Sequence, residues 1–570
     1  IESGRSAAHS GILAMRVSLL SFLLLGQAAS AAIVRQTATR AVLAGRAGRS
    51  AKSSVNAQPR AHPVAVATAQ DAVIVDESGP LADAIDETNP LHVIISGAGV
   101  GGLALANCLA AQAEKGTPVH FTVLERTSEF KRFGGPIQLA SNAMRSFREI
   151  DPGMYHTIES LATWTGNRTN GIKDGIRDEW YAKFDLKTPA EARQMPFTCV
   201  IDRPDLQNVL LERVQTSVRN SAAVASYSHD ERGGVSVVLE DGETLRGDVL
   251  IGADGIWSSV RANMRNQPAK GEGSGVTYSG YTVFAGELEY SGMDPTSGYT
   301  VYIGPQQYFV ITDIGKGRYQ WYAFLARPAN SEASEPKPEG ASPYLQKLFT
   351  GWSEDIHSIL RATKEHEIEQ RDLYDRPPSV FQTWGDGRAT LLGDAVHAMM
   401  PNLGQGGCQA IEDACVLSEE LTRLDSRSKI GEALKRYRAR RLARSAAVQG
   451  LSRLASDIII QGFDTPAKIT FKDGFKAENL NYNGIVTRLL QPILPIFFSI
   501  QFNFLYSGWR NEPLALEPIR DFFILSPVIL SGGLLVDAVL GGELLEGFIG
   551  LANPQMEIFR DLFDAVVAFF

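Results

Sequence analysis

Three glycines, at positions 97, 99 and 102, form a GxGxxG pattern between an apolar segment and a segment rich in alanine and leucine. In such a pattern Gly97 permits a tight turn, Gly99 lets the backbone approach a diphosphate, and Gly102 lets a helix pack on a strand. The amide groups at the start of that helix attract phosphate oxygens. A second apolar run, residues 119–124, ends at Glu125, whose carboxylate can accept hydrogen bonds from ribose hydroxyls. These residues predict a dinucleotide site without deciding between NAD and FAD.

Two later segments, residues 248–261 and 391–414, favour a flavin. Each is an apolar run that ends in Gly and Asp, and the second continues through a proline into a glycine-rich loop and a helix. Asp394, at the end of the second run, is placed to bind a ribityl or ribose hydroxyl. The loop 402–407 directs amide groups at a helix N-terminus toward an anion, and a reduced flavin is such an anion.

Cysteine spacing and net charge exclude other kinds of site. The four cysteines are Cys108, Cys199, Cys408 and Cys415. They contain no CxxC pair, and no Cys/His cluster has zinc spacing, so we expect no metal, no iron–sulfur cluster and no disulfide framework. Cys408 and His397 are interpreted as structural, because neither has a partner visible in the sequence. With 55 basic against 64 acidic residues and a net charge of -9, we expect no nucleic-acid partner.

Hydrophobic periodicity predicts the elements that position these residues. Residues 91–95 and 119–124 are typical of buried parallel strands, and 103–113 of a helix. Residues 275–328 contain short aromatic and β-branched runs separated by Gly and Pro, which indicates antiparallel strands. Such an aromatic-lined sheet suits a long apolar ligand, although each aromatic residue taken singly is more simply explained as sheet core. Residues 431–457 predict a helix that closes the domain.

Together, the three glycine-containing segments resemble the GxGxxG, DG and GD motifs of class A flavoprotein monooxygenases. By that resemblance Asp394 contacts the ribityl chain of FAD, and the glycines of 404–407 approach the isoalloxazine. Arg203 and Gln207 match the family's RxxLQ element, which also touches the flavin; the alternatives are a surface ion pair for Arg203 and an exposed helix position for Gln207. The resemblance assigns to the cofactor Gly97, Gly99, Gly102, Glu125, Arg126, Arg203, Gln207, Asp254, Gly255 and Asp394.

The resemblance also implies the fold class and the division of the chain. We expect an α/β fold: a Rossmann-like FAD-binding domain of the p-hydroxybenzoate hydroxylase type, an inserted and mostly antiparallel β-sheet substrate domain, and a helical C-terminal region. The expected parts are residues 1–31 (upstream residues and signal peptide), 32–89 (transit peptide and linker), 90–450 (monooxygenase domain, with the substrate sheet at about 270–330) and 451–570 (helical, apolar C-terminal region).

Further segments resemble the zeaxanthin epoxidase family, over roughly residues 92–445. They are GPIQLASNA at 135–143, YSGY at 278–281, QYFV at 307–310, QWYAF at 320–324, DLYDR at 372–376, HAM at 397–399 and QGGC at 405–408. The resemblance implies epoxidation of the ring double bonds of a xanthophyll, from zeaxanthin to antheraxanthin and violaxanthin. It implies FAD as cofactor, O2 as co-substrate, and NADPH or reduced ferredoxin as external electron donor. The residues implied at the reacting centre are Pro401, Gly404, Gln405, Gly406 and Gly407, with Gln138, Tyr281 and Trp321 at the substrate.

Two other functions stay open at this point. One is an FAD-dependent aromatic hydroxylase acting on a small phenol, against which the GPIQ and QWYAF segments argue. The other is an inactive flavin-binding protein that serves in thylakoid assembly, against which the complete Pro401–Gly407 loop argues. Plant members of the family end in a phosphopeptide-binding FHA domain. No segment here resembles it, so we do not expect regulation through such a domain.

The N-terminal sequence has the character of a two-part plastid address. Met15-Arg16, an apolar run at 17–25 and Ala29-Ser30-Ala31 resemble a secretory signal peptide. Residues 32–70 then contain arginines and serines but no acidic residue, which is typical of a transit peptide. The alternative is a plain secretory signal followed by a linker. We expect a plastid protein whose mature chain begins well after Ala31.

The C-terminal region has apolar stretches at 485–509 and 522–551 that polar and charged residues interrupt. The interruptions argue against a transmembrane helix. We interpret the region as making peripheral contact with the thylakoid or plastid membrane. Packing of the same stretches onto the enzyme core is the alternative.

Overall fold

The computed structural model describes residues 82–510 except for 131–134, 232, 305, 332–336, 338, 461–466, 471–475 and 481–493. The predicted signal peptide, most of the predicted transit peptide and the apolar stretch 522–551 lie outside the described residues. The chain divides into two compact units, and the described residues belong to the one that comprises Thr68–Gly541 and Gln555–Phe570.

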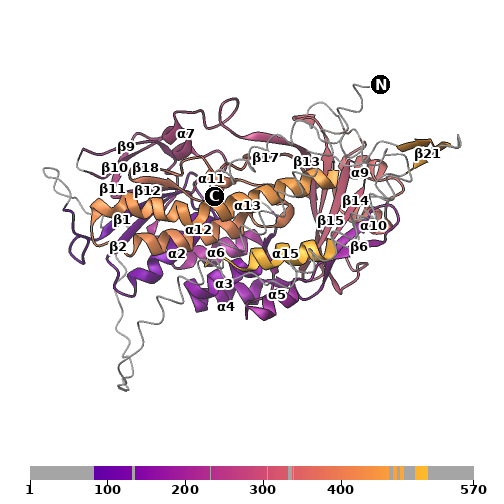
Figure 1. Ribbon diagram of the computed structural model, residues 1–570, viewed down its shortest axis with the longest axis horizontal. Coiled ribbons are helices and arrows are strands. Elements are labelled where there is room, and N and C mark those ends of the chain that lie inside the picture. The colour runs from indigo at the N-terminus through magenta and orange to yellow at the C-terminus, as the bar shows by residue number, and fades with distance from the viewer. Residues whose placement is uncertain are drawn as a thin grey trace, which may run out of the picture. The chain divides into compact units, whose positions relative to one another are not determined.

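A six-stranded sheet forms the centre of the nucleotide-binding part (Figure 1). Its strands, in spatial order, are β18 (Gly385–Asp386), β19 (Ala389–Leu391), β12 (Val249–Gly252), β1 (Leu91–Ser96), β2 (Val119–Leu124) and β8 (Val218–Arg219). All neighbours pair in parallel except β18 and β19. The predicted strands at 91–95 and 119–124 are therefore confirmed, and the apolar composition of β1 follows from its burial on both faces of the sheet.

Helices and two small sheets surround this central sheet. The helices of the first half of the chain are α2 (Val100–Ala113), α3 (Ser141–Ile150), α4 (Pro152–Leu161), α5 (Lys187–Ala192), α6 (Arg203–Glu212) and α7 (Ser259–Arg265). One antiparallel sheet contains β9 (Val224–His229), β10 (Val235–Leu239) and β11 (Thr244–Gly247), and the other contains β3 (Ile137–Leu139), β4 (Thr163–Trp164) and β7 (Cys199–Ile201).

A seven-stranded sheet forms the inserted part. Its spatial order is β17 (Ile368–Asp375), β13 (Thr277–Glu289), β16 (Arg318–Ala326), β15 (Gln307–Gly315), β14 (Ser297–Gly304), β5 (Thr169–Asp174) and β6 (Trp180–Lys183). Only β14 and β5 pair in parallel, so the predicted antiparallel character is confirmed. The sheet extends beyond the expected interval 270–330, because β5, β6 and β17 join it from outside.

The two faces of the seven-stranded sheet have different neighbours, and we call them the outer and the inner face. On the outer face Phe309 and Trp321 pack with α9 (Ala341–Leu348) and α10 (Glu354–Ala362). On the inner face Tyr308 and Phe324 stack with ring centres 4.2 Å apart, in a cluster that includes Met400. Since successive side chains of a strand point to opposite faces, the cluster membership of these residues settles the face of each strand position.

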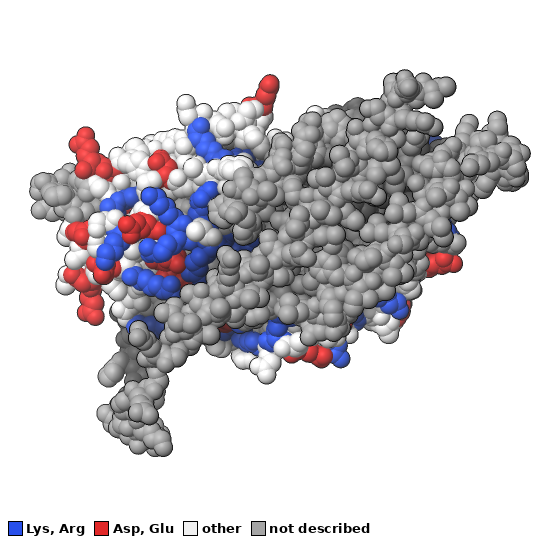
Figure 2. Space-filling model, in the orientation of Figure 1, with Lys and Arg blue, Asp and Glu red and all other residues white. Residues whose placement is uncertain are grey.

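Three helices of the second half complete the described fold. They are α12 (Gly406–Leu421), α13 (Ile430–Ile460) and α15 (Leu494–Tyr506), with the short α11 (Asp394–His397) and the hairpin β20 (Ala467–Thr470) and β21 (Lys476–Leu480). α12 and α13 lie side by side (Figure 1), and α13 confirms the helix predicted over 431–457. Opposite charges interleave over these helices (Figure 2): Arg436 and Arg440 pair with Glu420 at 2.7 and 2.8 Å. Among the described helices none is long and apolar enough to cross a membrane.

Candidate functional site

The GxGxxG turn connects β1 to α2, and its three glycines differ in what surrounds them. Gly97 has φ +107°, and a Cβ there would overlap the carbonyl of Ala253. A Cβ at Gly102 would overlap the carbonyl of Gly97, so both positions require glycine for the packing of the chain itself. At Gly99 a Cβ would meet nothing within 4 Å. The open space therefore lies at the glycine that was predicted to face a diphosphate.

The N-terminus of α2 is suited to an anion. Its N-cap is Gly99, no side chain caps it, and its first turn contains no acidic residue. Its first amide groups are thus left for another acceptor, and the positive end of the helix dipole favours a negative one. Glu125 lies beside this turn: its Oε2 accepts from the backbone N–H of Ala98 at 2.9 Å, and its Oε1 accepts from that of Thr127 at 3.0 Å. Glu125 therefore holds the turn, and Arg126 next to it is exposed.

Asp254 and Gly255 follow β12 at the same edge of the sheet. Asp254 Oδ2 accepts a hydrogen bond from the N–H of Val260 at 3.2 Å, whereas Oδ1 is buried without a hydrogen-bond partner among the described residues. Burial raises the pKa of Asp254. A Cβ at Gly255 would meet nothing within 4 Å. This pair thus combines an unsatisfied carboxylate oxygen with open space.

Asp394 and Arg203 share an unusual environment. Both side chains are exposed to solvent, yet burial raises the pKa of Asp394 and lowers that of Arg203. A side chain has both properties when it lines a recess within the protein. Within the described part of the chain neither side chain makes a hydrogen bond, although the charges of Arg203 and His397 oppose the shift at Asp394. The predicted pair of cofactor residues therefore presents a carboxylate and a guanidinium to the same recess. Gln207, one turn after Arg203 on α6, points its amide to the carbonyl of Ala98 at 3.5 Å.

The glycine-rich loop follows α11 and ends at the N-terminus of α12. Gly404 has φ +59°, a conformation that favours glycine, and a Cβ there would lie 3.1 Å from the Gln138 side chain. Gly406, the first residue of α12, does not have a positive φ. A Cβ at Gly406 would meet only Asp394 Oδ1 and Met399 Cγ, both at 4.0 Å. α12 carries no side-chain cap and no acidic residue in its first turn, which leaves its first amide groups open to an anion.

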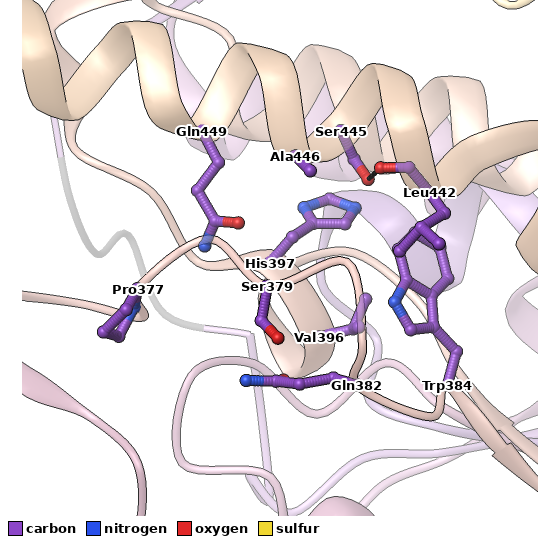
Figure 3. Close-up of a pocket in the computed structure, with 10 residues that line it drawn as sticks. All are labelled: Pro377, Ser379, Gln382, Trp384, Val396, His397, Leu442, Ser445, Ala446 and Gln449. Carbon is purple, nitrogen blue, oxygen red and sulfur yellow. Dashed lines mark hydrogen bonds between the residues drawn. The ribbon is translucent and has the colours of Figure 1, made fainter. Parts of the chain in front are cut away.

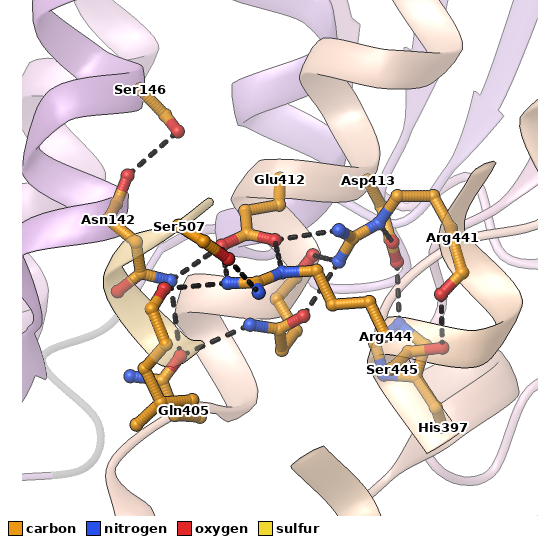
Figure 4. A network of polar contacts seen from close by, with 12 residues as sticks. Asn142, Ser146, His397, Gln405, Glu412, Asp413, Arg441, Arg444, Ser445 and Ser507 are labelled. Carbon is orange, nitrogen blue, oxygen red and sulfur yellow. Dashed lines mark hydrogen bonds and ion pairs between the residues drawn. The ribbon is translucent and has the colours of Figure 1, made fainter. Parts of the chain in front are cut away.

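A buried network of polar side chains lies behind this loop and joins α12 to α13 (Figure 4). Arg441 donates to Glu412 at 2.6 Å and to Asp413 at 2.7 Å. Arg444 also donates to Glu412, at 2.7 Å, and Asn142 of α3 donates to Glu412 at 2.6 Å. Burial alone would raise the pKa of Glu412, but Arg444 and Arg441 hold it below its ordinary value. The negative charges of two buried carboxylates and the positive charges of two buried guanidinium groups thus compensate one another inside the protein.

The same network fixes the loop and the end of β19. Asp413 accepts from the backbone N–H of Gly393 at 3.0 Å and makes a 2.6 Å hydrogen bond with His397 Nε2. The Gln405 side chain, predicted at the reacting centre, is buried and accepts from Asn142 at 3.2 Å. Its side chain positions the loop, while its neighbours Gly404 and Gly406 face the recess. The network thereby holds Asp394 and the helix N-terminus in a fixed relation.

His397 and Cys408 have partners that the sequence did not reveal. His397 Nδ1 is buried, has no hydrogen-bond partner among the described residues, and lines a cavity of about 10 Å³ (Figure 3). That volume holds about one water molecule, and Gln449 and Ser445 add polar groups to the lining. Cys408 Sγ accepts from the backbone N–H of Ala140 at 3.4 Å, and burial raises the pKa of its thiol to about 12. Both residues make these contacts behind the loop.

The three residues predicted at the substrate lie in different places. Gln138 neighbours Gly404, and Tyr281 is buried on the inner face. Trp321 is fully buried on the outer face, where its Nε1–H donates to Thr363 at 2.9 Å. This position does not support contact of Trp321 with a ligand. Polar and apolar residues alternate only partly along residues 275–328, so the sequence did not reveal which face of the sheet Trp321 occupies. Its neighbour Tyr322 lies on the inner face.

The inner face meets the glycine-rich loop directly. Tyr308 donates its hydroxyl hydrogen to Asn402 in the 3₁₀ helix Pro401–Leu403, at 2.9 Å. A Cβ at Gly135 would overlap the Gln320 side chain, so the GPIQ segment packs on the QWYAF strand. Segments that are far apart in the sequence thus converge around one recess. Sequence reasoning named the segments that contain Tyr308 and Asn402 but not the contact between them, because that contact depends on how the sheet packs on the loop. No cluster of metal-ligating side chains occurs within the described residues.

Comparison with known proteins agrees with this geometry. The chain belongs to the FAD-binding domain family, whose model matches residues 90–452. It is similar to the chloroplastic zeaxanthin epoxidases of Oryza sativa subsp. japonica (42% identical over 378 residues, 64% of this chain and 55% of that one) and of Solanum lycopersicum (42% over 393 residues, 67% and 56%). The chain therefore spans about half the length of the curated relatives it matches.

Solved structures define the fold class. Klebsiella pneumoniae HpxO complexed with FAD and uric acid is similar with a TM-score of 0.56 and 26% identity, covering 66% of this chain and 90% of that one. A salicylate hydroxylase substrate complex has a TM-score of 0.59 at 21% identity, covering 75% and 99%. The predicted α/β fold of the class A flavoprotein monooxygenases is confirmed, and FAD is the cofactor of the family.

Proposed function

We propose that this protein is an FAD-dependent monooxygenase that epoxidises the ring double bonds of a xanthophyll, converting zeaxanthin to antheraxanthin and violaxanthin. The observation that carries the proposal is the meeting of the aromatic inner face with the glycine-rich loop through Tyr308 and Asn402. An apolar wall beside a flavin-binding loop suits a long hydrocarbon. The similarity to chloroplastic zeaxanthin epoxidases supports the same substrate class.

The residues around the recess fit the chemical groups of FAD. Gly99 and the open N-terminus of α2 suit the diphosphate, and Asp394 suits the hydroxyls of the ribityl chain. Asp254, Arg203, Gln207, Glu125 and the neighbouring Arg126 complete the proposed cofactor site. When bound, FAD would take electrons from the donor and activate O2.

The chain itself would orient the ring, exclude water and stabilise negative charge. Gly404, Gly406 and Gly407, with Pro401 and Gln405 fixing the loop, would let the flavin ring approach the start of α12. Tyr281 and Gln138 would border the substrate ring at the inner face. One oxygen atom of O2 enters the epoxide and the other leaves as water, with two electrons from NADPH or reduced ferredoxin and two protons.

We further propose that the protein acts in a plastid, at the surface of the thylakoid or plastid membrane. The curated relatives are described as chloroplastic, and the sequence upstream of residue 82 has the composition of a signal followed by a transit peptide. A xanthophyll resides in lipid, so peripheral contact would shorten its transfer to the enzyme.

Product analysis tests the function. The full chain, loaded with FAD, is mixed with zeaxanthin in lipid micelles and with NADPH or reduced ferredoxin in separate reactions. We expect antheraxanthin and violaxanthin with at least one donor. Protein that is yellow and bleaches on anaerobic reduction but forms no epoxide would favour the assembly role, and hydroxylation of a simple phenol instead would favour the aromatic hydroxylase.

A further inference from the structure

A row of polar side chains crosses the inner face of the seven-stranded sheet. Tyr299 on β14 pairs with Thr312 on β15, and Thr312 pairs with Gln320 on β16. Residues that pair across neighbouring strands point to the same face, so these three side chains lie together. The adjacent row contains Val301, Val310 and Tyr322. One polar row therefore borders a largely apolar surface.

The hydroxyl of Tyr299 differs from those of the neighbouring tyrosines. Tyr308 donates to Asn402 at 2.9 Å, and Tyr322 donates to Gln320 at 2.7 Å. Tyr299 makes no hydrogen bond to a described residue, and its hydroxyl is not sealed from solvent. Although the Tyr299 side chain is only half-buried, the removal of water by the surrounding protein raises the pKa of its hydroxyl. Its hydroxyl therefore reaches an accessible recess within the protein.

Thr312 adds a second hydroxyl at the same place. Its side chain is nearly buried, and no hydrogen bond joins its hydroxyl to another described residue. Gln320, the third member of the row, packs against Gly135 of the segment that reaches the glycine-rich loop through Gln138. The two unpartnered hydroxyls thus lie on the face that meets the proposed flavin site, beside an apolar wall.

We propose that Tyr299, assisted by Thr312, recognises the hydroxyl group of the substrate ring and so selects hydroxylated over unhydroxylated rings. This inference rests on the proposed function and names the residues that determine its specificity. A site that hydrogen-bonds a substrate hydroxyl rejects the analogue without it, because the polar groups of the site are then left unpaired in an apolar setting. An entirely apolar wall would accept both rings.

The test uses β-cryptoxanthin, a carotenoid with one hydroxylated and one unhydroxylated ring, so that the two rings compete within one molecule. With wild-type holoenzyme we expect epoxidation mainly on the hydroxylated ring. Tyr299→Phe removes only the hydroxyl and should lower the ratio of the two products by about two- to twelvefold. Tyr319→Phe, which removes a hydroxyl from the outer face of the same sheet, should leave the ratio unchanged.

Binding measured by quenching of protein fluorescence, with zeaxanthin and β-carotene in matched micelles, provides a readout that needs no turnover. Tyr299→Phe should reduce the ratio of the dissociation constant of β-carotene to that of zeaxanthin. Thr312→Val serves as the second variant if Tyr299→Phe is less stable than the wild type. An unchanged product ratio and unchanged binding preference in the variants would overturn the inference. So would equal attack on both rings by the wild type. Absence of any epoxide from the wild type would instead overturn the proposed function, and the binding preference would still decide the role of Tyr299.

Discussion

Asp394 combines solvent exposure with a pKa raised by burial, and it has no hydrogen-bond partner within the described residues. Protein chains do not gain stability from such a carboxylate, because its charge is poorly solvated and unpaired. Arg203 lies 191 positions earlier in the chain, and burial disfavours its positive charge in the same way, since it lowers the pKa of the guanidinium. The arrangement is understandable if a ligand supplies the missing donors and acceptors. Residues of this kind should therefore lower the stability of the apoprotein and raise its affinity for the ligand.

The first prediction concerns affinity at Asp394. Asp394→Ala should weaken FAD binding about ten- to a hundredfold, since a charge-assisted hydrogen bond contributes roughly 1.5–3 kcal/mol. Titration of the apoprotein with FAD, followed by flavin fluorescence, measures the change. Asp386→Ala, at the exposed end of β18, serves as the control. Wild-type affinity in Asp394→Ala would show that the carboxylate is not a cofactor ligand.

The second prediction concerns pH. The raised pKa means that folded apoprotein binds the Asp394 proton more tightly than unfolded chain does. The stability of the apoprotein should therefore fall as pH rises from the ordinary aspartate range through the raised pKa. Asp394→Asn should be more stable than wild type above that window and equal to it below. Urea unfolding of both apoproteins from acid to neutral pH measures this, and parallel curves would contradict it.

The third prediction separates the glycines of the loop. A Cβ at Gly406 would meet only Asp394 Oδ1 and Met399 Cγ, both at 4.0 Å, so we expect Gly406→Val to fold normally and to project into the proposed flavin space. Gly406→Val should therefore cut epoxide yield more than it weakens binding of oxidised FAD, with the melting temperature little changed. Gly404→Val, at φ +59°, should lose stability instead. Parallel losses of stability, binding and yield in Gly406→Val would leave only a packing role.

At the scale of elements, α13 holds the loop end of α12 through buried ion pairs. Burial would lower the pKa of Arg441, but Asp413 and Glu412 outweigh it and raise the pKa. Tyr437 adds a hydrogen bond to the carbonyl of Leu391 at the end of β19, at 3.1 Å. The helix α13 thus fixes both β19, the strand that precedes Asp394, and the N-terminal end of α12. Buried pairs contribute little net stability when intact but are costly to break.

The fourth prediction follows from that asymmetry. Arg441→Met leaves Asp413 and part of Glu412 uncompensated and should lower the free energy of unfolding by about 3–5 kcal/mol. The affinity for FAD should also fall in Arg441→Met, because Asp413 makes hydrogen bonds to Gly393 and His397 on either side of Asp394. Arg440→Met removes ion pairs in which the arginine is 30% exposed and leaves Arg436 paired with Glu420, so it should cost less than about 1 kcal/mol. Denaturant unfolding of the two variants gives the comparison, and equal losses would contradict it.

Local patterns predicted some elements well and others not at all. The segments 91–95 and 119–124 are short apolar runs, residues 431–457 are rich in arginine, alanine and leucine, and the structure contains the two strands and the helix that these compositions predict. The positions of β5 and β17 in the seven-stranded sheet depend on pairing with distant strands, which leaves no local signal. Glycine spacing identified the turns of the recess, because each turn constrains its own few residues. Partners such as Arg441 for Glu412 depend on the packing of whole helices and could not be inferred.

At the scale of the whole described chain, buried arginines attach both of its ends to the core. Arg444 donates to the carbonyls of Phe504 and Leu505 at 2.9 and 2.7 Å, which anchors α15. Arg427 is buried and pairs with Asp248 at 2.7 Å. Arg427 also donates to the carbonyl of Ala84 at 2.8 Å, so residues before position 90, where the monooxygenase domain was expected to begin, pack on the core. Because guanidinium groups stay charged when buried, each end segment is needed to satisfy one.

The last prediction concerns where the mature chain begins. In addition to its ion pair with Asp248, Arg427 donates to the carbonyls of Ala82, Ala84 and Asn89 at 3.2, 2.8 and 3.4 Å. Removal of residues 1–81 leaves these three acceptors in place. Removal of residues 1–89 takes away these three acceptors and should cost about 1.5–3 kcal/mol. The cleavage that releases the mature protein should therefore fall after Ala31 and before Ala82.

Two measurements check this prediction. N-terminal sequencing of the protein from plastids should find a start within residues 32–82, and an intact Met15 or a start beyond Asn89 would contradict it. Denaturant unfolding should show that Arg427→Met costs much less in the chain that lacks residues 1–89 than in the chain that lacks residues 1–81, because the shorter chain has already lost most partners of the guanidinium. Equal costs in the two backgrounds would mean that the segment 82–89 does not satisfy Arg427.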